Sequence, residues 1–168
     1  MHAILSGSVG TPDRGTMELL QLLHDRGESI LDDALHAMER SHLRSYEQAG
    51  MDRARQRLCD LYVLTVSAVA ERKLEPIVAH AETIASERFA AGFDLWEVQT
   101  AFNVLEEAIW MRIIKELSPA QYAEALGLVS TVLGAGKDAL ARAYVSLASK
   151  TRAPALNLQS LFSGVVGT

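Results

Sequence analysis

The chain has 168 residues, a formal net charge of −5 and an apolar fraction of 49%. This is enough for a sizeable core, but an acidic chain offers no basic field for a row of phosphates, which disfavours nucleic-acid binding. Cys59 is the single cysteine and no apolar run is long enough to span a bilayer, so we expect a cytoplasmic protein without internal disulfides or membrane contact.

The composition favours helices, since leucine and alanine abound while only 6% of residues are aromatic and 4 are prolines. We therefore expect an all-α domain of about six helices over residues 16–150. Residues 1–15 are rich in glycine, serine and proline and predict a flexible arm. Residues 151–168 predict a carboxy-terminal tail, because Pro154 breaks the last helix.

Two helices separated by a break are predicted near the amino terminus. Thr16 is a possible cap of the first, which covers residues 16–25 and ends at Gly27. Ser29 resembles the cap of a second helix, which fades near Gly50. Its apolar stripe is Leu31, Leu35 and Met38.

A third and a fourth helix follow. Asp52 can cap the third helix. Pro76 suits the first turn of the fourth, where an amide hydrogen would lack an intrahelical partner. Apolar residues recur at helical spacing in both, at Leu58, Leu61, Tyr62, Val69, Ile77, Ala81 and Ile84.

The stretch "GFDLWEV", residues 92–98, predicts a sharp corner between the fourth and fifth helices. Gly92 stands where a helix commonly ends in a left-handed residue, and Asp94 and Glu97 have the spacing of a capping box. Phe93 and Val98 occupy the two positions of a hydrophobic staple. Geometry therefore explains this stretch before any chemistry is needed.

The fifth helix, predicted over residues 95–117, has two apolar stripes. One consists of Val98, Phe102, Leu105, Ile109 and Ile113, and the other of Trp96, Trp110 and Ile114, with Asn103 and Glu107 between the stripes. Two stripes need two surfaces to bury them. We therefore expect a homodimer, with Trp96, Asn103, Glu107, Trp110 and Ile114 as the interface candidates.

The motif "SPAQ", residues 118–121, matches a capping box with proline in the first turn and predicts a long sixth helix. Small residues such as Gly136 and Ala143 continue its apolar seam and allow another helix to approach closely. Gly127, Gly134 and Gly136 also make a kink possible.

The sequence contains no catalytic constellation and predicts no cofactor. A di-iron bundle needs two Glu-x-x-His pairs, and only Glu39 and His42 have that spacing. His80 lies in the fourth helix near Lys73 and Glu87, which indicates a solvated face rather than a haem ligand.

Residues 86–113, "SERFAAGFDLWEVQTAFNVLEEAIWMRI", resemble the amino-terminal helical domain of the RsbT co-antagonist proteins of the RsbR and RsbRD type, which also precedes helix-turn-helix domains in PucR-like regulators. The resemblance rests on Arg88, Gly92, Leu95, Val98, Ala101 and Phe102. It implies a globin-like helical fold without haem, usually dimeric, that serves as a sensory or partner-binding input in signalling.

The leading hypothesis is a non-enzymatic regulatory module that acts through dimerisation and contact with another protein, whose identity the sequence does not give. Two alternatives are a carrier or sensor of a small apolar ligand held between helices, and a metal-dependent bundle enzyme.

Overall fold

The computed structural model describes residues 13–43 and 50–152, and over this part of the chain it is all-α, as predicted. Residues 13–43 and 50–152 form five α-helices, close to the expected number of about six, and the first two predicted helices are one helix. The elements are α1 (Arg14–Arg40), α3 (Met51–Glu71), α4 (Glu75–Ala90), α5 (Leu95–Glu116), the 3₁₀ turn η1 (Pro119–Gln121) and α6 (Tyr122–Arg152).

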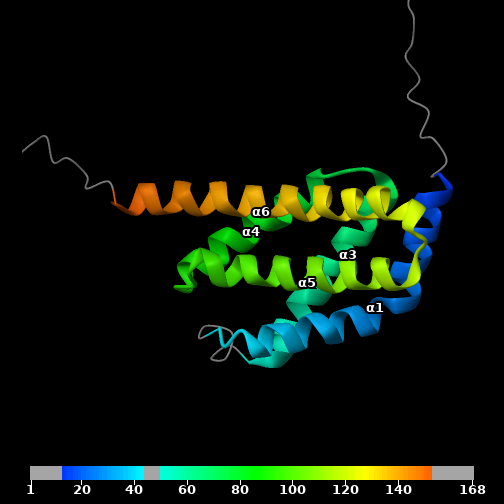
Figure 1. The fold of residues 1–168 in the computed structure, drawn as a ribbon. Coiled ribbons are helices and arrows are strands. Elements are labelled where there is room, and N and C mark those ends of the chain that lie inside the picture. The colour runs from blue at the N-terminus through cyan, green and yellow to red at the C-terminus, as the bar shows by residue number, and fades with distance from the viewer. Residues whose placement is uncertain (1–12, 44–49, 153–168) are drawn as a thin grey trace, which may run out of the picture.

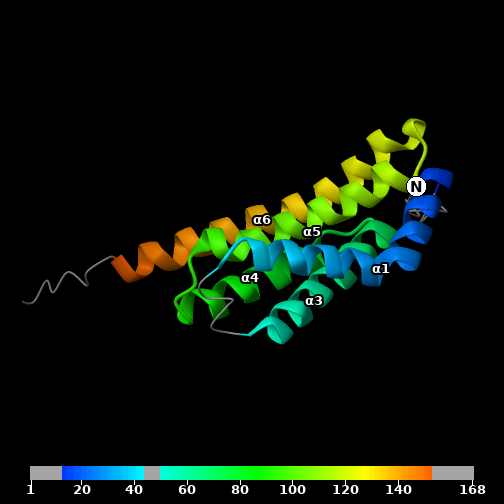
Figure 2. The same ribbon diagram turned by 60° about the horizontal axis from the view of Figure 1, so that its bottom comes forward.

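Helix α5 lies between α1 and α6, and it runs antiparallel to α6 (Figure 1). Helices α3 and α4 lie behind this layer and pack against α1 and α6, respectively (Figures 1 and 2). The core between the helices is built mainly from aliphatic side chains, with Met38, Phe102, Tyr62 and Tyr144 among its buried members. Its fully buried members include Leu23, Leu58, Ile77, Leu105 and Leu133.

Helix α1 runs without a break through Gly27, so the predicted end at Gly27 and new start at Ser29 are wrong. A β-carbon on Gly27 would lie 3.3 Å from the ring of Tyr62, whose hydroxyl donates a hydrogen bond to the Leu23 carbonyl at 2.5 Å. Glycine thus makes room for a tyrosine from α3. The hydroxyl of Ser29 donates to the Arg26 carbonyl at 3.0 Å inside the helix.

The cap of α1 is Asp13 and not Thr16, which is buried in the first turn. The Asp13 carboxylate accepts a hydrogen bond from the Thr16 amide at 2.8 Å, and this bond lowers the pKa of Asp13. The predicted cap of α3 is also wrong, because Gly50 takes that position and Asp52 lies in the first turn. Pro76 is in the first turn of α4, as predicted.

The amino terminus of α6 has the predicted capping box. The amide of Ser118 donates to Gln121 Oε1 at 3.0 Å, and the box forms a 3₁₀ turn that leads directly into α6. Helix α6 is one continuous element through its three glycines. Gly136 is the point of close approach, because a β-carbon there would lie 2.7 Å from Phe102 Cε1 and 3.4 Å from Ile77 Cγ1. The predicted small-residue seam is therefore confirmed at Gly136.

Candidate interaction surface

The corner between α4 and α5 sets the direction in which α5 leaves the bundle. Gly92 has a φ of +79°, the amide of Phe93 donates to the Arg88 carbonyl at 2.9 Å, and that of Gly92 donates to the Phe89 carbonyl at 3.1 Å. These two bonds form a Schellman motif. The capping box of Asp94 and Glu97 follows, with the Asp94 amide donating to Glu97 Oε2 at 3.3 Å. The left-handed glycine and the capping box of this corner are as predicted.

Phe93 ties this corner to the neighbouring helices. Its ring lies 5.4 Å from the guanidinium carbon of Arg88 and 5.7 Å from that of Arg57, which comes from α3. Its carbonyl accepts a hydrogen bond from the hydroxyl of Tyr144, on α6, at 3.3 Å. Val98 is buried, whereas direct staple contact between Phe93 and Val98 stays a prediction.

We expect Gly92→Val to lower the free energy of unfolding by roughly 1 kcal/mol or more, because a β-branched residue is strained at positive φ. A β-carbon on Gly92 would have nothing within 4 Å, so the loss would come from backbone strain alone. Urea denaturation measures it. Ala91→Val, one residue earlier at a negative φ, is the control, and equal stability of the two variants would contradict the prediction.

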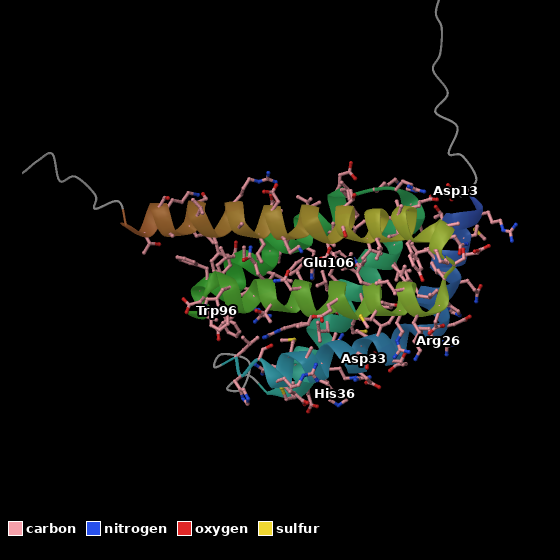
Figure 3. All side chains as sticks on the ribbon, viewed as in Figure 1. Asp13, Arg26, Asp33, His36, Trp96 and Glu106 are labelled. Atoms are coloured by element: carbon pink, nitrogen blue, oxygen red, sulfur yellow. The ribbon has the colours of Figure 1, made fainter. Side chains whose placement is uncertain are left out.

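One face of α5 carries large apolar side chains that the bundle leaves in solvent. The exposed fractions are 58% for Trp96, 38% for Trp110, 60% for Met111 and 48% for Ile114. By contrast, the stripe that begins with Val98 and Phe102 is buried to its end at Ile113. From Trp96 to Ile114 the exposed stripe extends over about 27 Å at 1.5 Å per residue. Figure 3 shows Trp96 at the amino-terminal end of α5.

Two polar residues occupy the middle of this face. Asn103 and Glu107 are both exposed, and Asn103 Oδ1 accepts a hydrogen bond from Lys137 Nζ, on α6, at 3.3 Å. We call the set of Trp96, Asn103, Glu107, Trp110, Met111 and Ile114 the outer α5 face. It is apolar towards its two ends and polar at its centre.

Ion pairs border the outer α5 face on both sides. Lys137 Nζ lies 2.6 Å from Glu106 Oε2, and the pair joins α6 to α5, where Figure 3 places Glu106. Towards α1, Arg112 pairs with Asp33 at 2.8 Å. Arg26 on α1 pairs with Glu116 at 2.7 Å, and this hydrogen bond raises the pKa of Arg26. Exposed apolar residues with a charged border are typical of a protein interface.

A shallow groove runs between α1 and α5 next to this face. It has a volume of about 350 Å³, and its walls include His36 and Asp33 from α1 and Glu107 and Met111 from α5. Figure 3 shows Asp33 and His36 on the α1 side. A neighbouring groove of about 330 Å³ reaches Ile114. The outer α5 face is therefore contoured rather than flat.

The structure places all five interface candidates on one exposed face of α5. Sequence reasoning missed Met111, which directly follows Trp110 and could have been found by extending the stripe by one position. It also missed Lys137 and Arg112 as border residues. Lys137 and Asp33, the partner of Arg112, belong to other helices, so no local pattern marks these pairs.

The side chains considered as metal ligands do not come together in one place. His42 is exposed at the end of α1 with a φ of +47°. Within residues 13–43 and 50–152 no group of three histidine, cysteine, aspartate or glutamate side chains is close enough to hold a metal ion.

His80 is half-buried, so the prediction of a solvated face is wrong at this residue. Its Nε2 is buried with no hydrogen-bond partner among the described residues. Burial lowers the pKa of His80, against the opposing charges of Asp60 and Glu87.

Folding stability is expected to decrease as the pH falls below the ordinary histidine pKa of 6.5, because the unfolded chain then binds a proton that folded His80 resists. The contribution is complete above that pKa and is lost as the pH falls through the lower folded pKa. The measurement is urea unfolding at about pH 7.5 and about pH 5.5 for wild type and His80→Gln. An equal pH dependence in both proteins would contradict the assignment.

None of the helices in the described ranges combines the length and the apolarity that crossing a membrane requires.

In the comparison with known proteins, one family model matches this chain. The model of the RsbT co-antagonist protein rsbRD N-terminal domain matches residues 58–154, more than half of the chain. The match includes the corner, α4 and α5, while α1 lies outside it. Neither a curated protein nor a solved structure matches the chain. With more than half of its length matched, the chain belongs to the rsbRD N-terminal domain family of RsbT co-antagonist proteins.

Proposed function

We propose that this protein is a non-enzymatic, cytoplasmic regulatory module that acts as a homodimer and through contact with another protein. Membership in the RsbT co-antagonist family supports a regulatory signalling role. We also propose that the module is a sensor of the globin-like type that binds no haem.

The outer α5 face is the observation that carries the proposal. Isolated exposed apolar residues are common, but here two tryptophans, a methionine and an isoleucine are exposed on the same face of one helix. Tryptophan and methionine are enriched in protein interfaces. If a partner covered these residues, each Å² of apolar surface removed from water would stabilise the complex by about 25 cal/mol.

Light scattering and native mass spectrometry of the purified protein test the proposal. We expect the molar mass of a dimer and no haem absorption or stoichiometric metal. A monomer at micromolar concentration would contradict dimerisation. Stoichiometric iron that is lost in Glu39→Gln or His42→Gln would instead favour the metal-dependent bundle enzyme.

A groove between α3 and α6 supports the second candidate, a carrier or sensor of a small apolar ligand. Its volume is about 460 Å³, within the range of small-molecule sites. Val69, Leu74, Leu128 and Val132 contribute apolar walls, and Arg72 also lines it. An apolar ligand that copurifies with the protein, and that is lost in Val132→Asp, would favour this candidate over the dimeric module.

A further inference from the structure

We infer that the outer α5 face pairs with the same face of a second copy in antiparallel orientation, with the two-fold axis at the level of Leu105. This inference rests on the proposed homodimer and specifies its geometry. A two-fold interface requires a surface that is complementary to itself.

Four of the six residues of the outer α5 face are arranged symmetrically about the level of Leu105, whereas Trp110 and Met111 have Thr100 and Gln99 at the corresponding positions on the other side. Asn103 and Glu107 are each two residues from it, and Trp96 and Ile114 are each nine residues from it. In an antiparallel pair, residues equally far from the axis on opposite sides face each other. Trp96 would therefore pack on Ile114 of the second copy, and Trp110 and Met111 would pack over Thr100 and Gln99 of that copy.

The polar centre of the face favours the same orientation. A parallel pair would place the Glu107 carboxylate against the Glu107 carboxylate of the second copy, and like charges in contact are destabilising. An antiparallel pair places it against the side-chain amide of Asn103. Lys137 already binds Asn103 Oδ1, which leaves the amide NH₂ group to donate to that carboxylate. Each Asn103–Glu107 contact would occur twice.

Disulfide cross-linking tests whether the two α5 helices of the dimer are antiparallel or parallel. Two versions of the full chain are prepared in a Cys59→Ser background, one with Asn103→Cys and one with Glu107→Cys, and they differ in mass by a tag. The two are mixed, allowed to exchange subunits and oxidised. Facing positions can form a disulfide because their β-carbons approach to about 4 Å, whereas positions further apart cannot.

We expect the mixed cross-link to exceed both self-cross-links by at least about tenfold, because only facing positions meet disulfide geometry. Thr83→Cys and Glu87→Cys form the control pair, since both positions are exposed on α4 with the same spacing. Predominant self-cross-links would show a parallel dimer and overturn the inference while leaving the dimer proposal standing. If the Asn103→Cys and Glu107→Cys proteins cross-link no faster than the control pair on α4, the antiparallel inference is overturned as well. A wild-type monomer in light scattering would overturn both the dimer and its orientation.

Discussion

Replacing Trp110 by glutamate is expected to convert the proposed homodimer into a folded monomer. The side chain begins the carboxy-terminal apolar part of the outer α5 face, next to Met111 and one turn before Ile114, and 38% of it is exposed within one copy. A dimer would bury a carboxylate at this position without a cation facing it. Truncating a central interface tryptophan commonly costs 2 kcal/mol or more, so the dissociation constant should rise by at least about 30-fold.

The measurement is molar mass by light scattering across a dilution series, with circular dichroism to establish that the variant is folded. Val63→Glu is the matched control, because Val63 is an exposed apolar residue on α3, behind α5 in Figure 1. We expect this control to remain a dimer. A folded Trp110→Glu dimer would place the interface elsewhere, and an unfolded variant would show that Trp110 stabilises the monomer.

Gly136→Leu is expected to lower the free energy of unfolding by about 3 kcal/mol, at the upper end of typical overpacking costs. The first added carbon would already lie 2.7 Å from the ring of Phe102, a buried side chain of α5, and protein cores are packed too densely for such a contact to relax freely. The leucine adds three further carbons. The substitution would therefore separate α6 from α5 and α4.

Gly134→Leu is the matched control for this substitution. It lies in the same helix two residues earlier, and a β-carbon there would have nothing within 4 Å. Leucine is a better helix former than glycine, so this variant should be as stable as wild type or more stable by up to about 1 kcal/mol. Chemical denaturation monitored by circular dichroism gives both values. Similar losses in the two variants would mean that α6 does not approach Phe102 at Gly136.

The sequence by itself determined the features that depend on near neighbours along the chain. The corner at Gly92, the capping boxes at Asp94 and Ser118 and the first-turn position of Pro76 all rest on hydrogen bonds or backbone preferences within a few residues. The buried stripe of α5 follows from helical periodicity in the same way. These local rules also identified Trp96, Trp110 and Ile114 as surplus apolar surface.

Tertiary packing decided the rest. Gly27 stays inside α1 because Tyr62 of a different helix needs its space, a contact that no local pattern encodes. The same holds for the ion pair of Glu106 with Lys137, whose partners are 31 residues apart. Only the assembled helices show that α1 and α6 cover the stripe of Phe102 and leave that of Trp110 in solvent, because burial depends on which helices lie on each side of α5.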